Sequence, residues 1–268
     1  MLQKKFAKVS EIVVCINCPR QLYYALNNSN CEADRKTSTA YLTHLFLREL
    51  ALRLPAILNN EHCLLDELKK ALDRVGEEIT LIYRSDLIDA KEEQVSLAKS
   101  AAEAQLHNIA SGLQASIERY GKERLYQLLT PWKLEQEMTS QKYMLVGRLD
   151  KIIRIEGRII PSIIKTSTPP DYGAWHPDRI QLTAYSILME EDFDVAVERG
   201  LVEYARSGTL REIAIKRHDR RRVLQLRDEA LKIKSGFLPE RTHCTSECNY
   251  CLHKARCEPR VSLASKFF

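Results

Sequence analysis

Two groups of cysteines carry the most specific chemistry in this sequence. They are Cys15 and Cys18 near the N-terminus and the series Cys244-x3-Cys248-x2-Cys251-x5-Cys257 near the C-terminus. Thiolates are soft ligands that select zinc or iron–sulfur clusters, and short spacings let one loop supply several ligands to one centre. The spacing alone leaves the identity of the metal open.

The cysteines also allow other arrangements. The four in the tail could close a tetrahedral zinc site without help from the N-terminus. Cys31 and Cys63 each stand alone. We interpret these two as structural thiols, because a free cysteine behaves as a small hydrophobic residue. In a reducing compartment none of the eight cysteines is expected to form a disulfide.

The size and composition of the chain indicate a folded protein. With 268 residues and 44% hydrophobic residues, it can bury a substantial core and is too apolar for a disordered protein. No stretch reaches the roughly 20 apolar residues that a membrane-spanning helix needs, and the N-terminus has no apolar signal core. We therefore expect a soluble, cytoplasmic protein with no membrane partner.

The elements that must position these residues follow from hydrophobic periodicity. Helices are expected over 38–54, within 66–128, over 178–190 and, with many basic residues, over 219–234. Strands are expected over 134–138, 142–155, 158–166, 201–205 and 210–215, with a turn at Glu156-Gly157. This order predicts an α/β (α+β) fold with a mixed central sheet flanked by helices. We divide it into a helical part (1–130), a sheet core (131–217) and a basic helix with a cysteine-rich tail (218–268), forming one interdigitated unit.

Basic and aromatic side chains permit nucleic-acid binding without requiring it. The basic residues lie around the last long helix and on the expected sheet, at Arg211, Lys216, Arg217, Arg220, Arg221, Arg222, Lys142, Arg148, Lys151 and Arg154. Tyr23, Tyr24, Tyr172 and Trp175 could stack on unpaired bases, which would favour single-stranded DNA. The net charge of +5 is modest, and a charge run is often only a solvated face.

The segment Cys18-Pro19-Arg20-Gln21-Leu22-Tyr23-Tyr24, together with the C-terminal cysteines, resembles the CRISPR-associated iron–sulfur exonucleases. These are relatives of the AddB and RecB type nuclease domains within the PD-(D/E)XK superfamily. The resemblance implies a restriction-endonuclease-like fold and a [4Fe-4S] cluster that joins the two chain ends. The implied cluster ligands are Cys18, Cys248, Cys251 and Cys257. Cys15 and Cys244 are then surplus, and either could replace a neighbour.

The same resemblance implies a nuclease site between the cysteine groups. His44 and Asp150, the latter in Gly147-Arg148-Leu149-Asp150, match residues that bind the catalytic Mg²⁺ or Mn²⁺. Lys165 matches the lysine that orients the attacking water. Gln181 and Tyr185 match residues beside the active site.

One position departs from the superfamily pattern. The motif strand should place a carboxylate two residues before Lys165, and Ile163 stands there. Side chains alternate along a strand, so the two flanking residues face the other way and cannot substitute. Glu135 or Glu137, on the preceding strand, could supply the missing carboxylate, or the metal could bind through backbone carbonyls and substrate phosphates. We take Glu137 as the catalytic candidate.

The resemblance implies a metal-dependent exonuclease that processes DNA with single-stranded ends, working with CRISPR integrase proteins. We assign DNA contacts to Arg20, Arg148, Arg220 and Arg221. Because of Ile163, an alternative is a non-catalytic DNA-binding or scaffold subunit. A third reading is a zinc-stabilised DNA-binding protein unrelated to nucleases.

Overall fold

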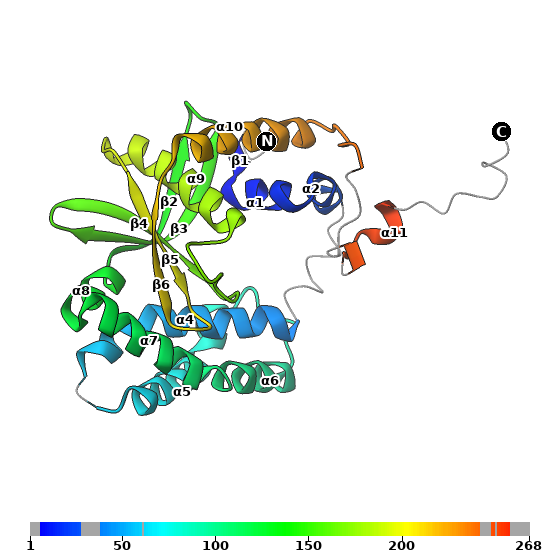
Figure 1. Ribbon diagram of the computed structural model, residues 1–268. Helices are drawn as coiled ribbons and strands as arrows, with labels where there is room; N and C mark the ends of the chain where they lie inside the picture. Colours follow the sequence, from blue (N-terminus) through cyan, green and yellow to red (C-terminus); the bar gives the residue numbers. More distant parts are fainter. Residues whose placement is uncertain (1–5, 28–37, 61, 242–247, 250, 258–268) are drawn as a thin grey trace.

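A six-stranded mixed sheet with helices on both faces forms the centre of the protein (Figure 1). The computed structural model describes residues 6–27, 38–60, 62–241, 248–249 and 251–257. Strands β3, β4, β5 and β6 are neighbours in that order. Both β1 and β2 also pair with β3, β1 only at Leu145 and Val146 and β2 along most of its length. The mixed α/β architecture expected from the sequence is confirmed.

The strands follow the predicted pattern closely. Their bounds are β1 Ala7–Lys8, β2 Pro131–Ser140, β3 Leu145–Ile155, β4 Arg158–Lys165, β5 Arg199–Tyr204 and β6 Thr209–Ala214. Strands β2, β3 and β4 form the expected antiparallel meander. It turns between β3 and β4 at Glu156 and Gly157, both with positive φ, as the sequence predicted. Strand β4 runs parallel to β5, and the short β1, which the sequence did not predict, runs parallel to the start of β3.

Helices make up most of the rest of the described chain. Their bounds are α1 Val9–Asn17, α2 Pro19–Leu26, α4 Thr39–Asn59, α5 Leu64–Ile82, α6 Glu92–Glu103, α7 Leu106–Tyr120, α8 Lys122–Leu129, α9 His176–Phe193, α10 Arg217–Lys234 and α11 Lys254–Cys257. Helix α4 begins where the Ser38 side chain accepts the Tyr41 N–H, and α2 begins with Pro19 directly after Cys18. None of the described helices is long and apolar enough to cross a membrane.

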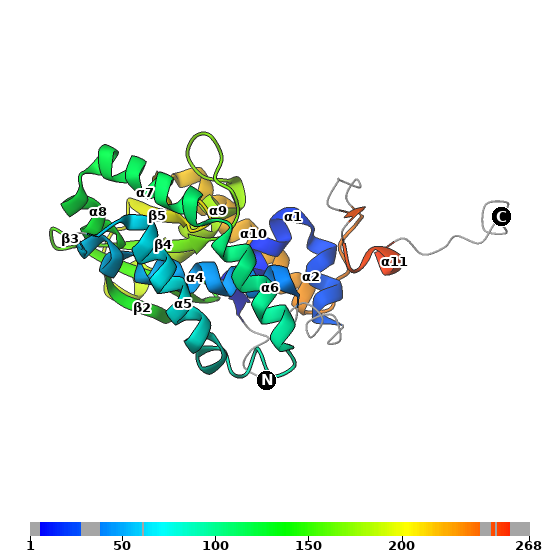
Figure 2. The same cartoon turned by 90° about the horizontal axis from the view of Figure 1, so that it is seen from below.

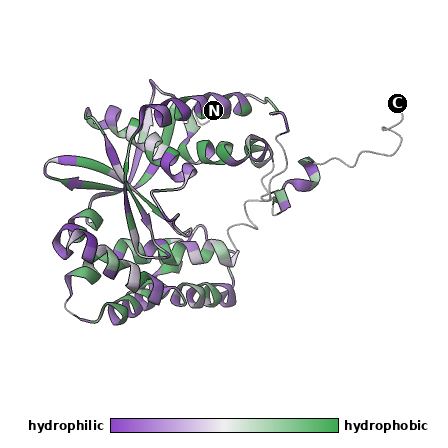
Figure 3. Ribbon diagram, viewed as in Figure 1, coloured by the Kyte–Doolittle hydropathy of each residue, from purple (hydrophilic) through white to green (hydrophobic). Residues whose placement is uncertain are grey.

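The sheet separates two hydrophobic cores. Helices α4 to α8 cover one face and pack on side chains such as Ile153 and Ile164. Helices α1, α9 and α10 cover the other face and pack on Ile152 and Ile163. These helices carry apolar residues on one side and polar residues on another, as the mixed colours of Figure 3 show. Neighbouring residues of one strand therefore enter different cores, as the alternation of side chains requires.

Helix α4 continues through Pro55, where the sequence predicted its end. Proline has no N–H, so the carbonyl of Ala51, one turn earlier, loses its partner in the helix. The ammonium of Lys151 lies 3.4 Å from that carbonyl oxygen and 2.7 Å from the Glu203 carboxylate. Lys151 is fully buried, so our expectation that it lies on the surface was wrong. A buried cation from β3 thus satisfies the carbonyl that the proline leaves unpaired.

The two ends of the described chain lie side by side. Helix α11 sits next to α2 in both views (Figures 1 and 2). The Tyr24 hydroxyl donates to the carbonyl of Arg256 at 3.3 Å. Arg20 donates to the carbonyl of Pro239 at 2.9 Å. Residues more than 200 positions apart are therefore in direct contact.

Candidate active site and cysteine centre

Asp150 lies where β3 and β4 stop pairing. The last paired residues towards it are Lys151 and Ser162. Beyond them the backbone N–H of Ile164 donates to a side chain of β3 instead, to Asp150 Oδ2 at 3.0 Å. The gap between the strands therefore fixes the carboxylate of Asp150 in place.

A single arginine from α4 occupies the space around this carboxylate. Arg48 donates to Asp150 Oδ1 from Nη2 at 3.2 Å and to Glu135 Oε1 at 2.7 Å. Its Nη1 donates to the Tyr83 hydroxyl at 2.8 Å and to Glu49 at 3.3 Å. Burial alone would lower the pKa of Arg48, but the charge of Asp150 and the bonds to Glu135 and Tyr83 raise that pKa overall. Arg48 is thus a permanent cation held between three carboxylates.

Glu135 reaches Arg48 from an irregular position in β2. Its neighbours Leu134 and Gln136 pair with Lys151 and Leu149, so Glu135 lies opposite Asp150. Its φ is 48°, a conformation that L-residues rarely adopt and that tends to occur at functional sites. Burial would raise the pKa of Glu135, but Arg48 lowers it below its ordinary value.

Glu137, our catalytic candidate, is exposed, and within the described residues no side-chain hydrogen bond or ion pair joins it to Asp150. The structure brings Glu135 to the aspartate instead. Both glutamates lie on the same strand, and the irregular backbone at residue 135 decides which of them reaches Arg48.

The position of the missing carboxylate is apolar and closed. Ile163 is fully buried in the core beneath α9. Two residues later, Lys165 Nζ lies 2.5 Å from Gln181 Oε1 and 2.9 Å from Asp178 Oδ1. Asp178 in turn accepts the Tyr204 hydroxyl at 2.9 Å. The lysine of the motif is therefore held by α9.

Close packing explains why a glycine stands at position 147, three residues before Asp150. A Cβ on Gly147 would lie 2.8 Å from the Val9 side chain and 2.9 Å from the ring of Tyr185. The Tyr185 hydroxyl donates to the carbonyl of Arg148 at 2.7 Å. Burial, and then the charge of Asp150, raise the pKa of Tyr185. Tyr185 is therefore a neutral donor that packs against the strand carrying Asp150.

His44 lies one turn before Arg48 on α4. Its Nδ1 is 2.8 Å from the Thr166 hydroxyl, directly after Lys165. Residues four apart on a helix share a face, so His44 and Arg48 both point towards the ends of β3 and β4. Our expected metal pair, His44 and Asp150, thus flanks the site, with Asp150 bonded to the guanidinium.

A profile of the PD-(D/E)XK nuclease superfamily matches residues 9–258. The chain belongs to this superfamily. A search of curated proteins finds no match. Nucleases of the superfamily typically use divalent metals such as Mg²⁺ or Mn²⁺.

The side chains of this superfamily member do not fit such an ion. Arg48 holds Asp150 and Glu135, and Ile163 fills the position of the motif carboxylate. Within the part of the chain that the structure describes, no three or more His, Cys, Asp or Glu side chains are grouped closely enough to hold a metal ion. The retained residues of the motif therefore surround a cation that belongs to the protein.

Arg48 and Asp178 are among the side chains of this site that the sequence did not point to. The sequence feature that points to Arg48 is its spacing: it follows His44 by four residues and so lies on the same face of the helix. Asp178 lies three residues before Gln181, so both reach Lys165 from one face of α9. Neither spacing is specific enough to predict the contacts that these residues make.

The cysteine end carries the donor type of a soft metal centre. Cys18 lies between α1 and α2 and is half-buried, and Cys248, Cys251 and Cys257 are half-buried as well, the last at the end of α11. The guanidinium of Arg20 lies 3.5 Å from Cys257 Sγ, which brings the two chain ends together. Thiolates are ligands of zinc and of iron–sulfur clusters, but within the described residues these cysteines are not grouped closely enough to hold a metal centre.

The other described cysteines, Cys15 and Cys63, differ from these four in their exposure. Cys15 is buried in the core, and burial followed by the charges of Glu229 and Glu11 raises its pKa to about 12. It is therefore a neutral core thiol, which favours Cys18 as the N-terminal ligand. Cys63 is exposed at the start of α5. Cys31, which we interpreted as a structural thiol, and Cys244, which we took as surplus, lie outside the described residues.

The four arginines that we assigned to DNA differ in how they are bound. Arg20 uses Nε and Nη1 within the protein, and Arg220 makes two bonds to Glu190, at 2.5 and 2.8 Å. Arg148 is 58% exposed, with a weak contact of 3.7 Å to Glu135. Arg221 is exposed on α10. Arg148 and Arg221 are therefore the more exposed of the four, whereas Arg20 and Arg220 are half-buried and bonded within the protein.

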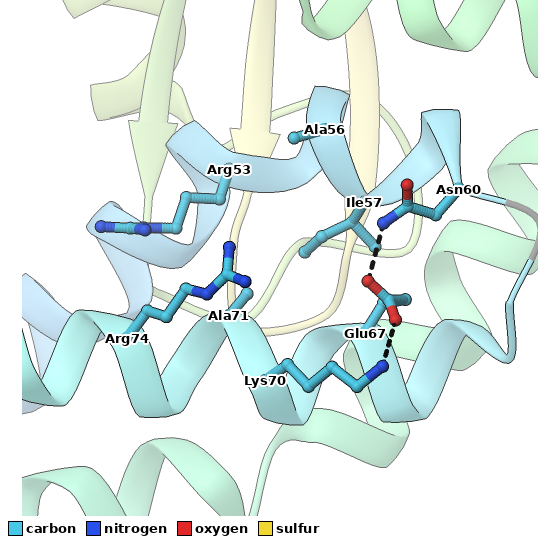
Figure 4. Close-up of a pocket in the computed structure, with 8 residues that line it drawn as sticks. All are labelled: Arg53, Ala56, Ile57, Asn60, Glu67, Lys70, Ala71 and Arg74. Atoms are coloured by element: carbon cyan, nitrogen blue, oxygen red, sulfur yellow. Dashed lines mark hydrogen bonds and ion pairs between the residues drawn. The ribbon is translucent and has the colours of Figure 1, made fainter.

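A separate pocket of about 150 Å³ lies between α4 and α5 (Figure 4). Its cations are largely committed: Arg53 pairs with Glu78 at 2.5 Å, and Glu67 accepts from both Lys70 and Asn60 at 2.7 Å. Its lining includes none of the residues around Asp150. It is therefore not part of the candidate site.

Proposed function

We propose that this chain is an iron–sulfur protein of the nuclease superfamily that binds DNA ends without hydrolysing them. It would serve beside CRISPR integrase proteins during spacer acquisition. The observation that carries the proposal is the guanidinium of Arg48, which bonds to Asp150 and Glu135 at once. The CRISPR context comes from the resemblance of the cysteine pattern alone.

The chemistry of phosphodiester hydrolysis explains why this observation matters. The reaction needs a hard divalent cation, held by carboxylates, to activate water and neutralise the charge of the transition state. Arginine neutralises carboxylates but cannot coordinate and activate a water molecule as a metal ion does. With Ile163 buried at the motif position, the site lacks the third oxygen donor as well.

The retained lysine supports binding. An ammonium has three N–H donors, and Gln181 and Asp178 accept two of those of Lys165. One donor is left for a phosphate oxygen. Tyr172, 91% exposed, and Trp175, 49% exposed, follow on the loop after β4 and can stack on unpaired bases.

Exposed cations on α10 supply the electrostatic attraction. Lys216, Arg217, Arg221 and Arg222 are all exposed in the first half of this helix or just before it. Such charges bind the DNA backbone without sequence preference and release counterions, so the affinity falls as salt rises. Of the four arginines that we expected to contact DNA, Arg221 lies on this surface.

The cluster in this proposal is [4Fe-4S], bound by Cys18, Cys248, Cys251 and Cys257. It would join the chain ends, a role that the contacts of α2 with α11 support. A cluster that ties α2 to the tail also fixes α1, which packs beneath the sheet. We assign it a structural role.

A second candidate is a working exonuclease, favoured by the contact of Glu135 with Asp150 through Arg48. If Arg48 moved away when DNA bound, these two carboxylates would face each other across the gap. Lys165 and Gln181 are in place for such a site. The two candidates differ in whether the protein cuts what it binds.

The test compares binding and cleavage on the same anaerobically purified protein. Fluorescence anisotropy with labelled single-stranded DNA should show binding that weakens strongly from about 50 to 200 mM salt. The same DNA, end-labelled and incubated with Mn²⁺, should stay intact. Cleavage by the wild type that Lys165→Ala abolishes would refute the proposal and establish the second candidate. Absence of binding would refute both.

A further inference from the structure

Tyr204 joins two parts of the molecule that lie on different elements. Its hydroxyl donates to Asp178 Oδ2 at 2.9 Å and accepts the backbone N–H of Trp175 at 3.3 Å. The other carboxylate oxygen of Asp178 lies 2.9 Å from Lys165 Nζ. One carboxylate and one hydroxyl thus connect the motif lysine to the residue that ends the loop between β4 and α9.

The fold brings these groups together and shields them from water. Tyr204 lies beside Lys165 in the parallel pair of β4 and β5, and Asp178 stands in the first turn of α9. Tyr204 is fully buried, and Asp178 is 6% exposed. Burial, followed by the charge of Asp178, raises the pKa of Tyr204, so the hydroxyl keeps the proton that it donates. Because the groups are buried, their hydrogen bonds are stronger than the same bonds would be in water.

We infer that Tyr204 is a positioning residue through which the protein selects single-stranded DNA. It holds the loop of residues 166–175, which carries the exposed rings of Tyr172 and Trp175, in a fixed place relative to the ammonium of Lys165. An unpaired base then stacks on the loop while a neighbouring phosphate oxygen meets the lysine. The inference rests on the DNA binding of the proposed function and names the kind of DNA that is bound.

Other contacts hold the loop to itself and to the sheet. Trp175 Nε1 donates to the carbonyl of Thr168 at 2.8 Å, so the indole bridges the two halves of the loop. Arg206, after β5, donates from Nε to the carbonyl of Thr166 at 2.9 Å. The bond from the Trp175 N–H to Tyr204 is the contact that ties the far end of this loop to the partner of the lysine.

The energetics of stacking explain why the position of the loop matters. Stacking of one base on an aromatic side chain strengthens binding about 5- to 150-fold. An unpaired base can stack in this way, whereas the bases of a duplex are stacked on one another. A loop that is already held in place loses little freedom when the base binds, and a loop without this bond must first be ordered.

The experiment compares Tyr204→Phe with Ser186→Ala. Ser186 is the matched control: it is fully buried on α9 and donates to the carbonyl of Thr183 at 2.7 Å, so its variant loses a buried hydroxyl but no contact of the loop. The first readout is acrylamide quenching of Trp175 in proteins that also carry Trp132→Phe, which leaves one tryptophan. The second is fluorescence anisotropy with a labelled single strand, its duplex and the same strand without bases.

The two variants should differ in both readouts. We expect Tyr204→Phe to be quenched more strongly than the wild type, because the loop is no longer held. Its preference for the intact single strand over the other two DNAs should fall about 5-fold or more. Ser186→Ala should match the wild type in both measurements.

The outcomes separate this inference from the proposed function. If Tyr204→Phe matches Ser186→Ala in both readouts, Tyr204 does not position the loop and the inference is wrong. If only the quenching changes, Tyr204 anchors the loop without selecting the DNA, and the inference is also wrong. A wild type that binds no DNA would refute the proposed function and the DNA selection with it, while the quenching still decides whether Tyr204 holds the loop.

A measurement on the wild type covers the case in which Tyr204→Phe does not fold by circular dichroism. Hydrogen exchange of the Trp175 amide, followed by NMR with ¹⁵N-labelled tryptophan, then replaces the variant. Slow exchange would support the bond to Tyr204. Exchange as fast as in an unfolded chain would overturn the inference.

Discussion

Replacing Arg48 by methionine should destabilise the protein more than any comparable surface change. Methionine keeps much of the side-chain length and removes the charge and all the donors. Asp150, Glu135 and Glu49 would then lose the cation they share, although Tyr83 still donates to Glu49 at 2.6 Å and Arg148 stays 3.7 Å from Glu135.

The magnitude follows from the burial of each partner. Arg48 and Glu49 are each 11% exposed and Asp150 is 22% exposed, so these pairs are close to buried. Removing one partner of a buried pair costs about 3–5 kcal/mol. Glu135 is 40% exposed, and such a pair contributes about 0–1 kcal/mol. We take the lower end, about 3 kcal/mol, which lowers the folding equilibrium constant roughly 100-fold.

The assay is urea unfolding of wild type and Arg48→Met, supported by thermal unfolding. A loss of about 3 kcal/mol corresponds to a fall in Tm of about 6–12 °C. The pH dependence has a defined sign. Arg48 lowers the pKa of Glu135 below its ordinary value of 4.5, so this contribution is complete above that pH. It is lost as the pH falls through the lower pKa of the folded state, and the difference between the two proteins should narrow there.

Arg53→Met is the matched control, on the same helix. Arg53 pairs with Glu78 at 2.5 Å, but the side chains are 27% and 48% exposed. Its loss should cost less than about 1 kcal/mol. If Arg48→Met and Arg53→Met unfold at the same urea concentration, the three carboxylates do not depend on Arg48. Our account of the site would then be wrong.

Three further outcomes test the rest of the structure. Cys18→Ala should lose the visible absorbance of the anaerobically purified protein while Cys15→Ala keeps it; the opposite result would make Cys15 the ligand. Lys151→Met leaves the buried Glu203 without its cation and should lower the free energy of unfolding in urea by about 3–5 kcal/mol. A loss well under about 1 kcal/mol would contradict the buried pair. Gly147→Ala introduces a Cβ that would lie 2.8 and 2.9 Å from two packed side chains, and should cost about 1–3 kcal/mol by the same measurement. No change in Gly147→Ala would mean that the strand can shift away from α9.

The sequence by itself determined the architecture. The alternation of Val and Ile along β3 and β4, with the Glu156-Gly157 turn between them, predicts the meander because side-chain periodicity and turn chemistry are local properties. The superfamily profile likewise matches residues 9–258 from the sequence alone. The absence of the motif carboxylate at Ile163 was visible without any coordinates.

Only the tertiary structure decided what surrounds Asp150. Arg48 is about 100 residues away from Asp150 in sequence. It binds Asp150 and Glu135 together because the irregular backbone of β2 turns Glu135 towards it. The continuation of α4 through Pro55 has the same origin, because the carbonyl left unpaired by the proline meets Lys151 from β3. Periodicity describes each element alone, whereas these contacts arise when burial forces charged groups on different elements to neutralise one another.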